Sequence, residues 1–260
     1  MAGRLDGKVA IISGGARGMG EAEARLFADE GARVALCDVR DELGQSVAAD
    51  IGEAAFYQHL DVTLEEDWAA VVAATEKAFG KVDVLVNNAG IAEAGMIGEM
   101  SVESYRSVID VNQVGVFLGM SAVVEPMTRA GGGSILNVSS IDGMIGMPGI
   151  VGYVSSKWAV RGMTKAAAME LGPRNIRVNS IHPGFIRTDL GTPEGMEPAM
   201  LHDMIDQHTK RLAPLARTGR PEEIAKLAVF LASEESSYST GSEFVADGGL
   251  IAGYPAPGGE

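Results

Sequence analysis

Short apolar runs alternate with longer helix-forming stretches along most of the chain. The apolar runs do not alternate with polar residues, and such continuous runs are typical of strands buried on both faces of a sheet. The predicted strands lie at residues 9–13, 33–38, 55–58, 82–86, 134–138, 176–181 and 243–245. The predicted helices lie at residues 21–30, 40–51, 64–79, 101–129, 152–171 and 221–232.

The alternation of strands and helices predicts an α/β fold, because right-handed strand–helix–strand units build a parallel sheet. We expect a doubly wound, seven-stranded, mostly parallel sheet with helices on both faces. No linker, composition break or internal repeat divides the sequence, so residues 1–260 are predicted to form a single domain. Residues 191–212 interrupt the pattern with two prolines and a Met-bearing amphipathic helix, and we expect them to form a substrate lid.

A glycine-rich turn joins the first predicted strand to the first predicted helix. Gly14, Gly18 and Gly20 have the spacing G-x-x-x-G-x-G, which differs from the commoner G-x-G-x-x-G. The unpaired N–H groups and positive dipole of a helix N-terminus bind a pyrophosphate well, although a tight turn without a ligand would use the same glycines. We expect this turn, including Arg17 and Met19, to bind a dinucleotide in a Rossmann-type domain.

The second predicted strand ends at Asp38. A carboxylate at this place accepts hydrogen bonds from the adenosine ribose hydroxyls and repels the 2′-phosphate of NADP. Arg17 acts in the opposite sense, because its guanidinium could pair with that phosphate. The sequence therefore favours NAD over NADP.

Two further strand ends carry residues that could contact a cofactor. Asp61 and Val62 follow the third predicted strand, and Asn88, Ala89 and Gly90 follow the fourth. Taken singly, each segment is explained by an ordinary turn. Because ligands of open α/β sheets bind beyond the carboxyl ends of the strands, the shared position of these segments favours a binding site.

Tyr153 and Lys157 are four residues apart at the start of a predicted helix and therefore share one of its faces. A cation beside a phenol favours the phenolate, so we expect Lys157 to lower the pKa of Tyr153 from about 10 toward working pH. Tyr153 would then serve as a general acid or base. The same spacing also occurs in ordinary surface pairs.

The composition excludes several classes of partner. A formal net charge of −14 repels nucleic-acid backbones and anionic membranes. The sequence has no run of 18 apolar residues and no signal-type N-terminus, so we expect a cytoplasmic protein that does not bind a membrane. No cluster of His, Cys and acidic residues has metal-ligand spacing, so we expect chemistry without a metal.

An ordered set of motifs resembles the classical short-chain dehydrogenase/reductase family over nearly the whole chain. Within that family, the chain is most similar to the bacterial 3α(or 20β)-hydroxysteroid dehydrogenases, through residues 57–63, 65–68, 153–162 and 176–184. The set makes an ordinary surface pair a poor explanation of Tyr153 and Lys157. Its motifs are Ser13-Gly14-x-x-x-Gly18-x-Gly20, Asp61, Asn87-Asn88-Ala89-Gly90, Asn112, Ser140, Tyr153-x-x-x-Lys157, Pro183-Gly184 and Thr188.

The resemblance implies four catalytic residues. Tyr153 would exchange a proton with the substrate oxygen while the nicotinamide exchanges a hydride, and Lys157 would lower the tyrosine pKa and hold the nicotinamide ribose. Ser140, chosen over Ser139 for its distance from Tyr153, would bind the reacting oxygen. Asn112 would hold a proton-relaying water, although a polar residue that distorts a helix also explains it.

The resemblance also implies contacts with the nicotinamide amide at Pro183, Gly184, Ile186 and Thr188. It further implies a homotetramer built through the helices near Asn112 and Tyr153.

The substrate is expected to be a bulky hydrophobic alcohol or ketone, with a hydroxysteroid or ketosteroid implied by the resemblance. Thioether side chains adapt to apolar shapes, although methionines at helical spacing also serve as plain core. One alternative is a 3-oxoacyl reductase acting on carrier-protein or coenzyme A thioesters, which Asp38 and the negative charge disfavour. Another is a dinucleotide-binding sensor without turnover. The methionines near the predicted site are Met96, Met144, Met147, Met196, Met200 and Met204.

Overall fold

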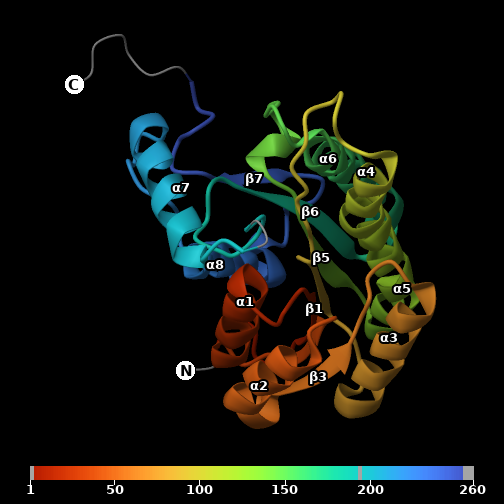
Figure 1. Ribbon diagram of the computed structural model, residues 1–260. Coiled ribbons are helices and arrows are strands. Elements are labelled where there is room, and N and C mark those ends of the chain that lie inside the picture. The colour runs from red at the N-terminus through yellow and green to blue at the C-terminus, as the bar shows by residue number, and fades with distance from the viewer. Residues whose placement is uncertain (1–2, 193–194, 254–260) are drawn as a thin grey trace.

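The computed structural model describes residues 3–192 and 195–253, and these residues contain a seven-stranded sheet (Figure 1). The strand order is β3-β2-β1-β4-β5-β6-β7, and all neighbouring strands are parallel, which confirms the predicted fold class. The chain reverses direction across the sheet between β3 and β4, so β1 and β4 flank the point where doubly wound folds bind ligands. The strands are β1 Val9–Ser13, β2 Arg33–Asp38, β3 Ala55–His59, β4 Val84–Asn87, β5 Gly133–Val138, β6 Ile176–Pro183 and β7 Glu243–Ala246.

Helices cover both faces of the sheet, as the sequence predicts (Figure 1). On one face lie α1 Gly18–Asp29, α2 Asp41–Ile51 and α8 Pro221–Ala232. On the other lie α3 Glu65–Phe79, α5 Gly115–Ala130 and α6 Val151–Leu171, with α4 Val102–Ile109 packed against α6.

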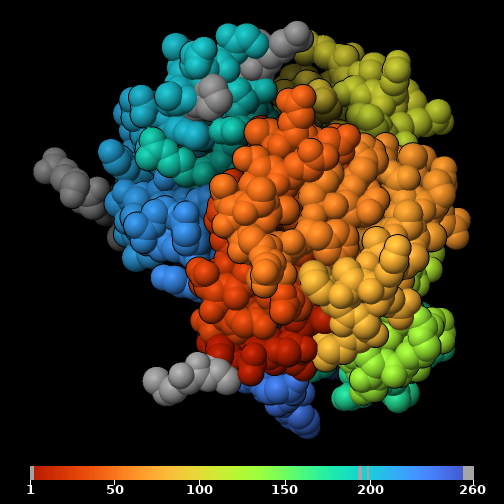
Figure 2. All heavy atoms as spheres, turned by 90° about the horizontal axis from the view of Figure 1, so that it is seen from below, coloured from red at the N-terminus to blue at the C-terminus, as the bar shows by residue number. Residues whose placement is uncertain are grey.

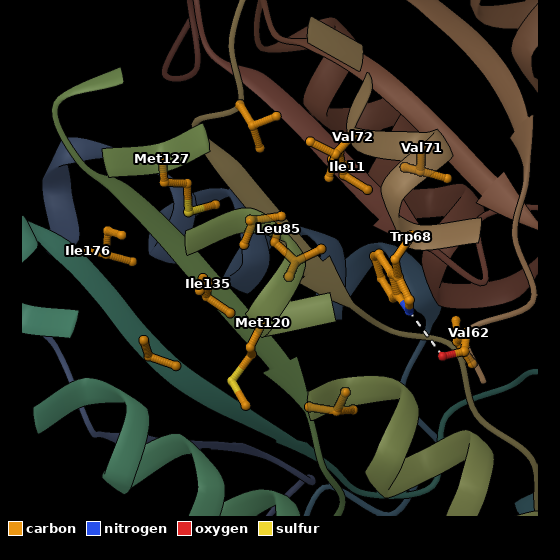
Figure 3. Packing of buried hydrophobic residues seen from close by; sticks show 14 of the residues in the cluster. Ile11, Val62, Trp68, Val71, Val72, Leu85, Met120, Met127, Ile135 and Ile176 are labelled. Carbon is orange, nitrogen blue, oxygen red and sulfur yellow. Dashed lines mark hydrogen bonds between the residues drawn. The ribbon is translucent and has the colours of Figure 1, made fainter. Parts of the chain in front are cut away.

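Neighbouring residues of each central strand belong to different cores. Ile11 of β1 packs in the core beneath α3, α5 and α6, whereas Ile12 packs beneath α1 and α8. Burial on both faces explains why the strands are continuous apolar runs. In the first core, Trp68 of α3 is fully buried, and its Nε1–H donates to the Val62 carbonyl at 3.0 Å (Figure 3). This bond fixes the segment after β3 that the sequence assigns to the cofactor site.

The long helix predicted at residues 101–129 is interrupted in the structure. A π-helical turn, Asp110–Val114, separates α4 from α5 and contains Asn112. Single π-turns within α-helices are frequently found at functional sites. Asn112 therefore distorts the helix and is also directed to a specific place.

The helical stretch Val102–Ala130 is long and apolar enough to cross a membrane, with a mean hydropathy of 1.5. In the structure it is a core helix of the fold. Val116, Met120, Val123 and Met127 of α5 are buried against β4 and β5.

The predicted lid forms the helix α7 Pro198–Leu212, which lies outside the sheet and its flanking helices (Figure 1). Its Met200 and Met204 side chains are exposed rather than part of a core. Pro193 and Glu194, which belong to the predicted lid, lie outside the described residues. The function of this segment as a lid stays a prediction.

Candidate active site

A pocket of about 390 Å³ lies at the carboxyl ends of the central strands and extends to the start of α6. Most of the residues predicted to bind the cofactor line this pocket. It therefore joins the glycine turn, the ends of β2, β3 and β4, and the Tyr153–Lys157 pair into one site. These lining residues are Gly14, Arg17, Gly18, Met19, Asp38, Asp61, Val62, Asn88, Ala89, Gly90, Tyr153, Lys157 and Thr188.

Four predicted cofactor contacts are not part of the pocket lining. A Cβ on Gly20 would lie 2.2 Å from the Gly14 carbonyl oxygen, so Gly20 allows α1 to pack against the turn. Gly184 is similarly crowded by Asp247. Pro183 ends β6 in a buried position, and Ile186 packs against the core beneath α1 and α8.

The sequence analysis missed several lining residues. Some of them directly follow the ends of β2, β3 and β5. This position could have identified them, because the carboxyl ends of the strands face the same pocket. Others come from the segments after β4 and β6. The missed residues are Val39, Arg40, Leu60, Ile91, Val111, Val138, Ser139, Asp189 and Leu190.

Ser13 at the end of β1 and Asn88 directly after β4 hold each other's backbone at the pocket. Ser13 Oγ accepts the backbone N–H groups of Asn88 and Ala89 at 3.1 and 3.2 Å. The Asn88 amide donates in return to the carbonyls of Ser13 and Gly14, at 3.0 and 3.1 Å. Gly14 has a φ of +66°, and a Cβ there would lie 2.8 Å from the Ala89 Cα. Only glycine fits this position without moving the backbone.

The N-terminus of α1 is suited to an anion. The helix begins at Gly18, and among the described residues no side chain caps its first turn. Free N–H groups and the helix dipole therefore face the pocket. Arg17, at the N-cap, places its Nη1 3.4 Å from Asp189 Oδ2, a partner that the sequence analysis did not foresee.

Asp38 is held rigidly at the same end of the pocket, beside the glycine turn. Its Oδ2 accepts the N–H of Ala16 in the glycine turn at 3.1 Å, and its Oδ1 accepts the N–H of Arg40 at 3.0 Å. Its carbonyl oxygen accepts the N–H of Leu60 at 3.0 Å. The carboxylate therefore has a fixed place beside the glycine turn, and its contact with an adenosine ribose stays a prediction.

Tyr153 and Lys157 lie together on α6, with the Lys157 Nζ 5.5 Å from the centre of the tyrosine ring. Lys157 is only 3% exposed, and its Nζ donates to the Val138 carbonyl at 2.9 Å. Burial lowers the pKa of this lysine to about 8.

The expected fall in the pKa of Tyr153 is wrong for this structure. Burial raises the pKa of Tyr153 to about 12, with the charge of Asp142 acting in the same direction and a hydrogen bond with Ser140 opposing it. The ammonium of Lys157 lies over the ring, whereas the one hydrogen bond that it makes within residues 3–192 and 195–253 goes to a backbone carbonyl. Desolvation of the phenolate is therefore the dominant effect.

Asn112 is fully buried beside this pair. Its Oδ1 accepts the N–H of Ile91, and its Nδ2 donates to the Ile91 carbonyl, both at 2.8 Å. Its Nδ2 also lies 3.2 Å from Ser156 Oγ. A Cβ added to Gly90 would lie 3.3 Å from Asn112 Oδ1 and 3.6 Å from Lys157 Nζ, so both polar groups border the space next to Gly90. One lone pair of Oδ1 remains for a further donor.

Ser139 and Ser140 have different partners. The Ser139 hydroxyl donates to the Lys157 carbonyl at 2.9 Å and is thereby used to hold α6. The Ser140 hydroxyl interacts with Tyr153 and accepts the N–H of Asp142 at 3.0 Å. Ser139 lines the pocket whereas Ser140 does not, and the choice of Ser140 as the residue near the reacting oxygen stays a prediction.

Two residues that the sequence analysis missed surround Ser140. Asp142 is 7% exposed; its Oδ2 lies 3.4 Å from Ser140 Oγ, and its Oδ1 has no hydrogen-bond partner among the described residues. Burial raises the pKa of this carboxyl. The His182 Nδ1 lies 2.9 Å from the Ser140 carbonyl, and its Nε2 lies 2.8 Å from Ser180 Oγ. An acidic residue within an apolar loop is the signal that could have identified Asp142.

The sequence is similar to known reductases and dehydrogenases. A family model described as Enoyl-(Acyl carrier protein) reductase matches residues 14–251. A 3-alpha-(or 20-beta)-hydroxysteroid dehydrogenase of Mycobacterium tuberculosis is 50% identical over 97% of this chain and 93% of its own length. A trans-4-hydroxycyclohexanecarboxylate dehydrogenase of Sinomonas cyclohexanicum is 42% identical over 96% of this chain and 95% of its own length.

A solved structure gives the same result for the fold. The crystal structure of a short-chain type dehydrogenase/reductase from Mycobacterium marinum matches with a TM-score of 0.88 and 37% identity. The match covers 96% of this chain and 97% of that chain. Dehydrogenases of this kind use NAD(P). The chain belongs to the short-chain dehydrogenase/reductase family and is similar to the 3-alpha-(or 20-beta)-hydroxysteroid dehydrogenases.

Proposed function

We propose that the protein transfers a hydride between NAD(H) and a hydrophobic secondary alcohol or ketone, with a hydroxysteroid or ketosteroid as the substrate. The observation that carries this proposal is a single pocket lined at one end by the glycine turn and Asp38 and at the other by Tyr153 and Lys157. When bound, the nicotinamide supplies the hydride donor or acceptor.

Tyr153 acts as the general acid and base. With a pKa of about 12 it holds its proton at neutral pH, which suits donation to a carbonyl oxygen during reduction. Oxidation of an alcohol needs the phenolate, so its rate should rise with pH. Ser140 donates a hydrogen bond to the reacting oxygen and stabilises the charge that develops there.

Lys157 and Asn112 support this proton transfer. Lys157 lies beside Tyr153 and holds the ribose hydroxyls next to the nicotinamide. The remaining lone pair of Asn112 accepts a water that relays protons to Lys157 from solvent. The buried position of both residues next to Gly90 supports these roles.

NAD rather than NADP is the proposed cofactor. Asp38 presents a fixed carboxylate at the ribose end of the pocket, and this negative charge repels a 2′-phosphate. Arg17, the residue that could attract this phosphate, is paired with Asp189. Pro183, Gly184, Ile186 and Thr188 are proposed to border the nicotinamide amide, and of these Thr188 lines the pocket.

The steroid assignment is supported by relatives and by surface chemistry. Both named relatives are dehydrogenases, one of a hydroxysteroid and one of a hydroxycyclohexane carboxylate. Met96 and Ile97, in the segment after β4, are exposed, as are Met200 and Met204 of α7. Exposed apolar side chains of this kind gain by covering a bulky apolar substrate.

A 3-oxoacyl thioester reductase is a second candidate, because the description of the matching family model, Enoyl-(Acyl carrier protein) reductase, names a carrier-bound acyl substrate. The net charge of −14 would repel an acidic carrier protein. A panel of ketosteroids, cyclic ketones and 3-oxoacyl thioesters, assayed with NADH and NADPH, tests the proposal. We expect the highest kcat/KM for a ketosteroid with NADH. A preference for thioesters with NADPH would contradict it, and a lack of any turnover would favour a dinucleotide sensor.

A cytoplasmic homotetramer is the proposed assembly. Phe117 of α5 is 55% exposed and Met169 of α6 is 82% exposed, and Val102 and Trp158 are exposed on α4 and α6. Burial against a second copy would remove these apolar side chains from water. Light scattering at micromolar concentration should give four times the chain mass of 27.1 kDa. A monomer would contradict the assembly.

A further inference from the structure

The turn between β2 and α2 forms the ribose end of the pocket, and its shape depends on a residue outside the pocket lining. Tyr57 of β3 lies in the strand next to β2, with its hydroxyl within hydrogen-bond distance of the Asp38 carbonyl oxygen. The same hydroxyl lies 2.7 Å from Asp41 Oδ1 at the start of α2. Tyr57 thus ties the end of β2 to the beginning of α2 with one side chain.

The ring of Tyr57 is fixed as firmly as its hydroxyl. A Cβ added to Gly44 of α2 would lie 2.1 Å from the tyrosine Cε2, so the ring occupies a notch that only glycine leaves open. His59 Nδ1 lies 2.7 Å from the same Asp41 oxygen and holds that carboxylate from the other side. The α2 and β3 segments, coloured orange, occupy the centre of the face shown in Figure 2.

Asp38 is thereby held through both its carboxylate and its backbone carbonyl. Its carboxylate accepts two backbone N–H groups, from Ala16 and Arg40, and its carbonyl accepts the Leu60 N–H as well as the Tyr57 hydroxyl. Rigid placement of a recognition group raises selectivity, because the group cannot rotate away from an ill-fitting ligand at low cost.

We propose that Tyr57 is a positioning residue for cofactor selectivity, which acts by holding Asp38 against the adenosine ribose. This inference rests on the proposed recognition of NAD by Asp38. Loss of the hydroxyl frees the β2–α2 turn, so that the Asp38 carboxylate binds the ribose hydroxyls less well and can move aside for a 2′-phosphate.

Tyr57→Phe tests the inference, because it removes the hydroxyl and keeps the ring in its notch. We expect the Kd for NADH, measured by its fluorescence, to rise about three- to tenfold, the range for one lost hydrogen bond. The ratio of kcat/KM with NADH to kcat/KM with NADPH should fall by a similar factor, while kcat at saturating NADH stays within about twofold. Tyr238→Phe, at a fully exposed tyrosine, is the matched control and should behave as the wild type.

Gly44→Ala provides a second variant that keeps the hydroxyl but displaces the ring, and it should reduce the same selectivity ratio. Asp38→Ala is measured in parallel and should abolish the preference for NADH. If Asp38→Ala loses selectivity while Tyr57→Phe retains the wild-type Kd and ratio, the role of Tyr57 is overturned and that of Asp38 stands. If Asp38→Ala retains selectivity, the proposed cofactor recognition and the role of Tyr57 are both overturned.

Discussion

The two ends of the pocket are built in different ways. At the cofactor end, side chains such as Ser13, Asn88 and Asp38 hold the backbone through hydrogen bonds of about 3 Å. At the catalytic end, Tyr153 and Lys157 are ionisable and have pKa values shifted by burial to about 12 and about 8. The side chains of the cofactor end therefore fix the shape of the pocket, whereas those of the catalytic end fix which groups carry a proton.

Because of this difference, we expect the two ends to respond to different kinds of substitution. Changes of volume should damage the cofactor end, because a close-packed turn has no room for an added atom. Changes of charge should alter the catalytic end, because a buried charge acts through a low local dielectric. Three substitutions test this distinction, from the largest expected effect to the smallest.

Gly14→Ala should have the largest effect. The added Cβ would meet the Ala89 backbone at 2.8 Å and would force alanine to adopt a φ of +66°. We expect a loss of about 1–3 kcal/mol in the free energy of unfolding and a tenfold or greater loss in NADH affinity, by thermal unfolding and fluorescence titration.

Gly7→Ala is the matched control, because Gly7 has a φ of +72° but nothing within 4 Å of the added Cβ. It should show the strain of the backbone alone, with unchanged NADH affinity. Equal effects of the two substitutions on NADH binding would contradict a tightly packed cofactor end.

Glu23 of α1 tests whether the pH dependence of stability arises away from the catalytic end. Both of its carboxylate oxygens are buried without a hydrogen-bond partner among the described residues, and burial raises its pKa to about 8. The folded state therefore keeps a proton that the unfolded state releases above about pH 4.5. Stability is full below that pH and falls, by up to about 1.4 kcal/mol per pH unit, until pH reaches about 8.

Glu23→Gln should remove this decline in urea unfolding measured between pH 5 and 8, with the pH profile of activity unchanged. Glu66→Gln, at an exposed glutamate of α3, is the control and should retain the decline. If the free energy of unfolding of Glu23→Gln declined with pH as steeply as that of the wild type, groups other than Glu23 would cause the decline.

Asp142→Asn should have the smallest effect and should act on activity alone. After burial, the charge of Asp142 is a further cause of the raised pKa of Tyr153. Without that charge the phenolate forms at lower pH, so the rise of alcohol oxidation with pH should move toward lower pH. Asp110→Asn, at an exposed aspartate of the π-turn, should leave the profile in place. A shift toward higher pH would contradict the role of Asp142.

Local patterns were sufficient to predict most of the fold. A strand buried on both faces needs a continuous apolar run, and the predicted bounds of β1, β2 and α8 are those of the structure. The predicted start of β4 lies two residues early. A distortion of the helix at Asn112 was one of two explanations that the sequence left open, but its form as a π-turn could not be read from the residues.

The geometry of the cofactor end could be predicted better than that of the catalytic end, because it too follows from local patterns. Strand ends and glycine turns follow from the order of elements along the chain, so their convergence could be foreseen. The pKa of Tyr153, the pairing of Arg17 with Asp189 and the buried carboxyl of Asp142 depend on tertiary burial and on residues distant in sequence. The pKa of Tyr153 and the pairing of Arg17 have no local signature, whereas Asp142 is marked only by being an acidic residue within an apolar loop.

The central claim is that Tyr153 transfers the proton that accompanies hydride transfer, and Tyr153→Phe tests it most directly. The measurement is the single-turnover reduction of a ketosteroid by enzyme saturated with NADH, together with the Kd for NADH. The account predicts a loss of about 10²- to 10⁴-fold in the rate of reduction, with the Kd for NADH within about threefold of the wild type. A rate within tenfold of the wild type would contradict the account.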